Sequence, residues 1–284
     1  ENLQNRLQRT QQKIKNSFLS ELVDNHRQAI LKLDREEIYR EFECRFPGEY
    51  FTHVVVHLFI NAVAGDDEDY GFLLPKIQKM MKERMEKYCS EWMSIIHNEE
   101  VVCLFNSVEN KREDFIRQLY RLKVDISNIK ALFPRYKVAI GVGRTVEGLE
   151  QYQESISTAM SAIRNRFGRK DEFLLEEEGR AASESEVSSI VSAAVKRDLL
   201  KSIELVDTES FLKSLRDLKR ELSAHLQDGE LLYGVYRELV TIFIMGMNSW
   251  FDSEIKTTPW ELMRGYQQLY GFEEVFDWLI DQGG

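Results

Sequence analysis

The sequence predicts an α+β fold in three parts: a helix over residues 1–33, a mixed domain over residues 34–180 and a helical subdomain over residues 181–284. Three observations support this division. The first part is polar with a thin apolar seam, the second combines β-branched runs with helical periodicity, and the third shows helical periodicity alone. The composition changes after "GRAASESEVSS", which marks the last boundary. A chain of 284 residues is long enough for one large domain or two modest ones.

Composition restricts the class of protein. Hydrophobic residues make up 43% of the chain and charged residues 30%, a profile typical of a soluble protein with a substantial core. The formal net charge of −10 argues against direct binding to nucleic acid, because phosphate contacts need a basic surface. The chain has three widely spaced cysteines, Cys44, Cys89 and Cys103. Because their number is odd and their spacing wide, neither a disulfide framework nor a zinc motif is predicted. We therefore expect a reducing, cytoplasmic setting.

The chain shows no membrane or secretion signal. No signal peptide opens the sequence, and the uncharged stretch at residues 239–251 is shorter than the roughly 20 residues that span a bilayer. We therefore expect no membrane segment in this chain. Because it begins at Glu1 without a methionine and ends in "DQGG", we expect it to be an excised segment of a longer protein.

The opening helix is a candidate for pairing between subunits. Residues 1–33 contain no glycine or proline, and the helix surface is rich in Gln, Asn, Arg and Lys. A polar helix with a narrow apolar stripe often pairs with a copy of itself, so we predict a coiled-coil-like homodimer. The alternative is a helix that frays or lies on its own domain. The candidate dimer seam consists of Leu3, Leu7, Ile14 and Phe18.

The mixed domain begins after the turn signal "FPGEY" with "FTHVVVHLFI", a run typical of a strand. A helix follows from residue 72, and "MSIIHNEEVVCLF" at residues 93–105 predicts a β-hairpin. A second helix has an apolar face from Phe115 to Ile129, "YKVAIGVG" predicts a further strand, and a third helix runs from Leu149 to Phe167. "EFLLEEE" predicts a last strand. The first six elements have the ferredoxin-like order βαββαβ.

The residue types that carry chemistry do not form a catalytic or metal-binding pattern. Gly141-x-Gly143 follows a strand, but Val146 stands where a dinucleotide loop needs its third glycine. His53 and His57 lie four residues apart on a predicted strand, about 13 Å from each other, so they cannot bind one metal ion. We therefore predict no catalytic residue, no metal site and no cofactor.

One stretch resembles a known family. "YKVAIGVGRTVEGLEQYQESISTAMSAIRNRF" is similar to the middle region of YesN-type, AraC-family response regulators, and of regulators with a CdaR/PucR-type domain. In that family a strand ends in I-G-x-G-R, and a helix with small residues follows a loop. The strand-turn motif is Ile140, Gly141, Gly143 and Arg144, and the helix positions are Tyr152, Ser155 and Ala159. The resemblance covers most of residues 15–175 and implies a degenerate relative of the GGDEF, diguanylate cyclase fold.

The resemblance also places the hairpin on the GGDEF signature. His97, Asn98, Glu99 and Glu100 stand where the family has G-G-D-E, so the acids remain but both glycines are lost. The first strand carries His57 where the family has a metal-binding acid, and the family's inhibitory R-x-x-D motif is missing before the hairpin. We therefore interpret Glu99 and Glu100 as a solvated turn, and the domain as not an enzyme.

The resulting functional hypothesis is a dimerisation and signal-relay module of a cytoplasmic AraC-family transcription regulator in a two-component system. It would link an input receiver or sensor to a helix-turn-helix domain outside this chain, and only that domain would bind DNA. A receiver or a histidine kinase is a possible partner in the parent protein. The alternative is a ligand-sensing module for a guanine nucleotide or another small molecule, and an active diguanylate cyclase ranks third. In the ligand-sensing alternative, aromatic residues of the tail line a pocket: Trp250, Phe251, Trp260, Tyr266, Tyr270 and Trp278.

Overall fold

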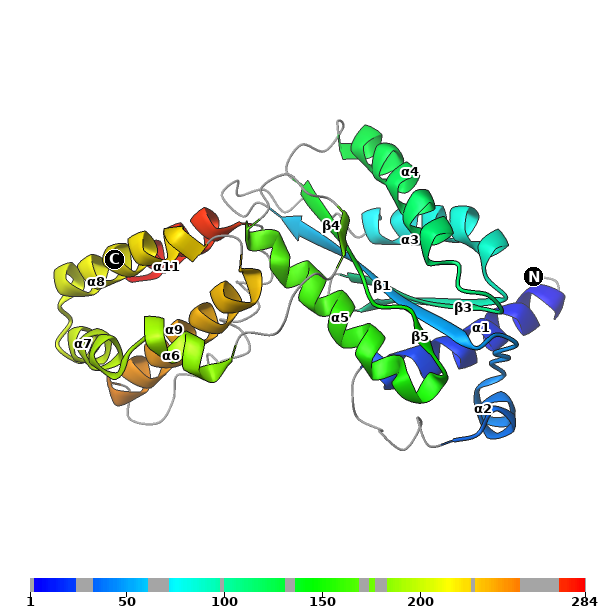
Figure 1. Cartoon of the computed structure of the whole chain (residues 1–284), viewed down its shortest axis with the longest axis horizontal. Helices are drawn as coiled ribbons and strands as arrows, with labels where there is room; N and C mark the ends of the chain where they lie inside the picture. The colour runs from blue at the N-terminus through cyan, green and yellow to red at the C-terminus, as the bar shows by residue number, and fades with distance from the viewer. Residues whose placement is uncertain are drawn as a thin grey trace. The chain divides into compact units, whose positions relative to one another are not determined.

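The computed structural model describes residues 3–23, 33–60, 72–97, 100–130, 136–168, 174–176, 183–225, 228–250 and 271–283. The chain divides into two compact units. The mixed unit comprises Glu1–Leu58, Gly65–Ile163 and Phe173–Glu177, and the helical unit comprises Phe59–Ala64, Arg164–Glu172 and Glu178–Gly284. Figure 1 shows the sheet of the first unit and the helices of the second.

The mixed unit is built on one sheet whose strands have the order β2-β3-β1-β4-β6, with the short β5 paired to β1. β3 runs antiparallel to both β1 and β2, whereas β4 and β6 are parallel. The register is fixed by pairs such as Val55 with Val102, and Ile95 with the same Val102 on the other side. The strands are β1 (Tyr50–Ile60), β2 (Glu91–His97), β3 (Glu100–Ser107), β4 (Tyr136–Val142), β5 (Val146–Glu147) and β6 (Leu174–Glu176).

Helices cover both faces of this sheet. Figure 1 shows α3 and α4 on one side, and α1 and α5 on the other. Because β1 is buried on both faces, its sequence is a nearly continuous apolar run, without the polar alternation of a half-exposed strand. The helices are α1 (Leu3–Val23), α2 (Arg35–Phe42), α3 (Leu73–Met85), α4 (Arg112–Lys130) and α5 (Tyr152–Arg164), with 3₁₀ turns at Glu86–Tyr88, Leu149–Gln151 and Asn165–Gly168.

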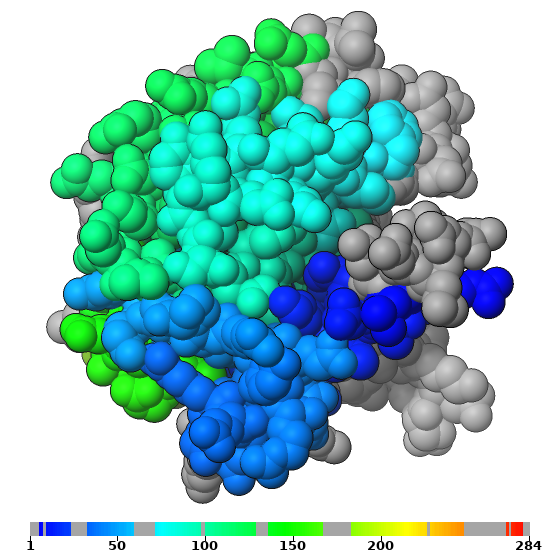
Figure 2. Space-filling model, turned by 90° about the vertical axis from the view of Figure 1, so that its right-hand side faces the viewer, coloured from blue at the N-terminus to red at the C-terminus, as the bar shows by residue number. Residues whose placement is uncertain are grey.

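The second half of α1 lies on its own domain, which corrects one residue of the predicted dimer seam. Phe18 is fully buried, and its ring lies 5.2 Å from that of Phe42. Ile14 is partly buried against the same core cluster. Leu7 is 61% exposed, and the first turns of α1 (dark blue) form part of the surface in Figure 2. The prediction that Phe18 belongs to the dimer seam is therefore wrong. Of the predicted seam residues whose side chains are described, Leu7 alone is exposed. The side chain of Leu3 lies outside the described residues.

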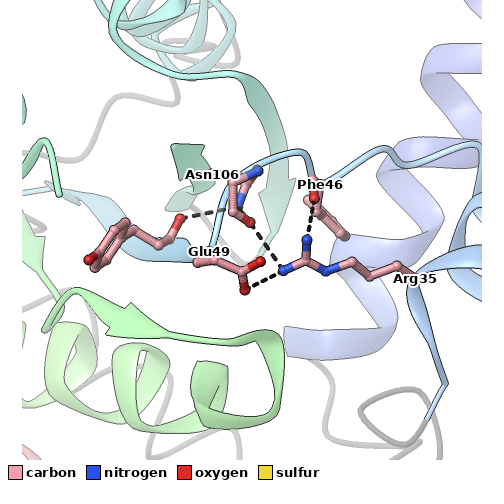
Figure 3. Close-up of polar contacts among 6 residues, drawn as sticks. Arg35, Phe46, Glu49 and Asn106 are labelled. Atoms are coloured by element: carbon pink, nitrogen blue, oxygen red, sulfur yellow. Dashed lines mark hydrogen bonds and ion pairs between the residues drawn. The ribbon is translucent and has the colours of Figure 1, made fainter. Parts of the chain in front are cut away.

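Polar contacts stabilise the turn at residues 46–49, which leads into β1 (Figure 3). Arg35 donates to the carbonyl oxygen of Phe46 at 3.1 Å and reaches Oε2 of Glu49 at 2.5 Å. Buried Asn106 on β3 accepts from the backbone nitrogen of Gly48 at 3.0 Å and donates to its carbonyl oxygen at 2.9 Å. A Cβ at Gly48 would lie 2.0 Å from the carbonyl oxygen of Ser107, so this turn needs glycine to lie against β3.

The helical unit has its own apolar core. Side chains at helical spacing meet in it, among them Leu199, Leu215 and Leu239. Ser183, Ser192 and Asp207 cap three helix starts through side-chain oxygens. In the part of the chain that the structure describes, no helix has the length and apolar character to cross a bilayer. The helices are α6 (Glu184–Ile190), α7 (Ala193–Glu204), α8 (Thr208–Leu222), α9 (Gly229–Trp250) and α11 (Phe272–Gly283), with a 3₁₀ turn at Ser223–His225.

Candidate functional site

The hairpin of the mixed unit brings two histidines and one acid into a single row. Glu100 at the start of β3 is paired in register with His97 on β2 and with His57 on β1. Side chains directly opposite each other on neighbouring antiparallel strands project from the same face, so all three share one face of the sheet. Asn98 and Glu99 lie outside the described residues.

Glu100 is not a solvated turn residue, which corrects that prediction. Its Oε1 lies 2.6 Å from Nδ1 of His57, and the two side chains are 12% and 4% exposed. The physical reason is the register: β3 begins at Glu100, so its side chain is held over the sheet instead of projecting from the tip of the hairpin. The Glu100 carboxylate, which the sequence resemblance places at the signature position, is therefore paired with a side chain of β1.

The described residues contain no group of three His, Cys, Asp or Glu side chains positioned to hold a metal ion. Metal-assisted phosphoryl transfer needs carboxylates that converge on the cation from separate elements. At this end of the sheet the strand opposite Glu100 supplies an imidazole, which engages the carboxylate directly.

A second polar cluster joins the centre of the sheet to α5. The backbone nitrogen of His53 donates to Oγ of Ser155 at 2.9 Å, and the backbone nitrogen of Gly143 donates to the carbonyl oxygen of His53 at 2.9 Å. Nδ1 of His53 lies 2.5 Å from the hydroxyl oxygen of Tyr152. Burial lowers the pKa of His53 to about 3, so the ring is neutral at physiological pH. Burial also raises the pKa of Tyr152 well above its ordinary value.

The glycines of the strand-turn motif serve close packing. A Cβ at Gly141 would lie 2.4 Å from the carbonyl oxygen of Ala159, and one at Gly143 would lie 2.0 Å from that of Ser155. Gly141 in β4 and Gly143 just after it therefore face two small residues four apart on α5. This geometry lets the helix backbone lie directly against the strand. Ile140 is fully buried in β4.

Arg144 ends this motif with contacts to α5 of two kinds. Its backbone nitrogen donates to Oγ1 of Thr158 at 2.7 Å. Its guanidinium, on an exposed side chain, forms an ion pair with Glu154. Gly141, Gly143 and Arg144 thus contribute to the β4–α5 junction, and Ile140 is buried in β4.

Comparison with known families agrees with this geometry. A family model described as a GGDEF-like domain matches residues 36–164, from α2 to the last residue of α5. Residues 36–164 form a GGDEF-like domain. The match covers less than half of the chain, and no curated protein matches it. Glu100, which the sequence resemblance places at the family's signature position, pairs with His57 at one end of the sheet.

Sequence reasoning missed the two histidine contacts. It excluded His53 and His57 as ligands of one metal ion but did not predict their partners, which are Tyr152 and Glu100 respectively. The signal available in the sequence was the two-residue period of the strand, which puts both rings on one face of a sheet covered by α5. The partners come from distant segments and became visible only in the folded chain.

Proposed function

We propose that the GGDEF-like domain of this protein is a non-catalytic relay and dimerisation module. The observation that carries the proposal is the pairing of Glu100 with His57 at the signature position. A nucleotide cyclase needs acids there that are available to metal ions and glycines that let the backbone approach the nucleotide. In this chain one acid is engaged by a histidine, and His97 and Asn98 replace the glycines.

The relay would run through α1. Nζ of Lys15 and Oε1 of Glu91 lie 2.7 Å apart, which joins this helix to the start of β2. Phe18 and Leu19 anchor the same helix in the core, whereas Leu7 projects from its first turns. A change in the pairing of the exposed turns would therefore reach the sheet through a packed and ion-paired helix.

In its fuller form, the proposal places this module in a cytoplasmic AraC-family, two-component transcription regulator with a ferredoxin-like core. The module would connect an input receiver or sensor to a DNA-binding domain outside this chain. The acidic net charge of −10 supports this arrangement, because DNA contact would fall to the other domain. The resemblance of the Ile140–Arg144 segment to the YesN-type middle region supports the family assignment.

A single-turnover assay tests the catalytic part of the proposal. The full chain is incubated in excess over GTP with Mg²⁺ and separately with Mn²⁺, and the products are separated by chromatography. We expect GTP to remain intact. Formation of cyclic di-GMP or of the linear dinucleotide intermediate would overturn the proposal.

Light scattering after gel filtration tests dimerisation. We expect a dimer that dissociates in Leu7→Asp and persists in the matched variant Lys13→Asp, whose exposed side chain lies outside the apolar seam. A strict monomer at high concentration contradicts the relay proposal. So does a dimer that Leu7→Asp leaves intact.

A second candidate function is ligand sensing, favoured by a cavity within the helical unit. The tail aromatics predicted to line such a pocket do not form it in the described residues: Trp278 packs against the helical core, no side-chain position is described for Trp250, and the other four lie outside the described residues. Calorimetry with GTP and with cyclic di-GMP separates the guanine-nucleotide version from the relay module, because only the former predicts heat of binding.

A further inference from the structure

A cavity of about 580 Å³ opens within the helical unit, among residues of α6, α7 and α9 and beside Arg164 at the end of α5. All of its lining residues belong to this unit. Its volume falls within the roughly 300–1,000 Å³ typical of small-molecule pockets. The cavity contains no residue of the GGDEF signature, so ligand binding there is independent of the relay proposal.

Two glycines of α9 allow its neighbours to approach and form the walls. A Cβ at Gly229 would lie 2.3 Å from Cα of Asn165, and one at Gly234 would lie 2.6 Å from Cγ2 of Val187. Gly229 therefore lets the start of α9 lie against the backbone that carries Arg164. Gly234 lets α9 lie against the Val187 side chain of α6.

One wall holds a buried carboxylate with an unoccupied oxygen. Glu230 is 7% exposed, and Nε of Arg164 donates to its Oε1 at 2.8 Å. Among the described residues, Arg164 is the one side-chain partner of Glu230, and it contacts Oε1 of this cavity-lining carboxylate. The Arg164 guanidinium also lies 5.1 Å from the centre of the Tyr233 ring, which helps to fix its position. A carboxylate in a cavity wall with one oxygen left unpaired by the protein can bind a cationic group.

The remaining charges of the wall are of both signs. Lys196 and Glu238 neutralise each other, with Nζ and Oε1 2.5 Å apart. The side chains of Arg237 and Glu184 also line the cavity, and within the described part of the chain neither has an ion-pair or hydrogen-bond partner. The cavity thus presents one open guanidinium together with open carboxylate oxygens.

We propose that this cavity binds a small zwitterion of the α-amino acid class. Arg237 would bind the ligand carboxylate, Oε2 of Glu230 and the carboxylate of Glu184 would accept hydrogen bonds from its ammonium group, and the Tyr233 ring would contact its side chain. A zwitterion brings one charge of each sign and leaves the net charge of the site unchanged. A polyphosphate would instead bring several negative charges to a wall whose three cations are matched by three carboxylates, so the wall offers no excess positive charge to bind it.

The test is thermal unfolding of the full chain with each standard L-amino acid at millimolar concentration, followed by calorimetric titration of every amino acid that raises Tm. We expect at least one to bind, and its Kd to rise about tenfold in Arg237→Gln and in Glu184→Gln, since each removes a charge-assisted contact. Both residues are at least partly exposed, so both variants are expected to fold. The matched controls Arg216→Gln and Glu204→Gln remove exposed charges outside the cavity and are expected to bind like the unmodified chain.

Three results would overturn the proposal. The first is that no amino acid raises Tm. The second is an affinity that is unchanged in Arg237→Gln and Glu184→Gln. The third is an equal response to acetate or to methylammonium alone, which would show recognition of a single charge instead of a zwitterion. None of these results bears on GTP turnover, so the failure of this proposal is distinguishable from that of the relay proposal.

Discussion

His53 should make the mixed unit sensitive to mild acid. Its ring is fully buried between β1 and α5, and burial alone lowers its pKa from 6.5 to about 3. The folded chain therefore does not take up a proton that the unfolded chain accepts below pH 6.5. The stabilisation is fully present above pH 6.5 and is lost as the pH falls from 6.5 towards 3.

The magnitude follows from the size of this shift. Each pH unit below 6.5 should cost about 1.4 kcal/mol of unfolding free energy from this one group, and the whole window at most about 5 kcal/mol. At pH 4.5 the loss is roughly 3 kcal/mol, a large part of the stability of an ordinary domain. Carboxylates add their own pH dependence in this range, so the contribution of His53 must be isolated by substitution.

Urea unfolding at pH 7, 6 and 5, followed by circular dichroism, makes the measurement. His53→Asn keeps a polar atom near the position of Nδ1 but cannot be protonated, so its unfolding free energy should fall less steeply with acid than that of the unmodified chain. Tyr152→Phe removes the hydroxyl while leaving the ring of His53 buried, so it should lose stability at every pH and keep the steep slope. Equal slopes in His53→Asn and the unmodified chain would refute the reasoning.

Three further predictions concern close packing, capping and the helical core, and urea unfolding checks each. Gly143→Ala should lower the free energy of unfolding by about 2 kcal/mol or more, because the new Cβ meets backbone at 2.0 Å; Gly271→Ala, whose Cβ meets nothing within 4 Å, should cost less than about 1 kcal/mol, and equal losses would contradict the packing argument. Asp34→Ala should cost about 1 kcal/mol by removing a capping box, and an unchanged midpoint would count against that role. Leu215→Ala should cost about 2–5 kcal/mol, since the side chain is 1% exposed, and a near-neutral result would mean that this core is not close-packed.

The elements that local pattern determines were predictable. The β-branched run at residues 51–60 forms most of β1, and residues 93–97 and 100–105 of the predicted hairpin lie in β2 and β3. Helical spacing from residue 72 likewise corresponds to α3. In each case the side-chain period and the turn residues carry the information within a short window of sequence.

The partners of those elements were not predictable, because packing between distant segments decides them. The apolar stripe of α1 predicts that something covers it, but not whether a second chain or the chain's own sheet does so. The structure buries Phe18 against Phe42 and Phe46, which assigns half of the stripe to the mixed unit. For the same reason the sequence showed Glu100 at a polar turn but not the imidazole of a strand more than 40 residues earlier.

Residue types that serve ligand binding in other proteins have packing and pairing roles in this fold. Gly141 and Gly143 would suit a phosphate-binding loop, yet carbonyl oxygens of α5 fill the space that a ligand would need. His57 and Glu100 carry side chains that can ligate metals in other proteins, and here they bind each other. The two glycines thus allow close packing of a helix, and the histidine and the glutamate pair with each other within the chain. Charged side chains of both signs line the cavity of the helical unit, among them Glu230, Arg237 and Glu184. The two assays, GTP turnover and amino-acid binding, therefore test the two proposals separately.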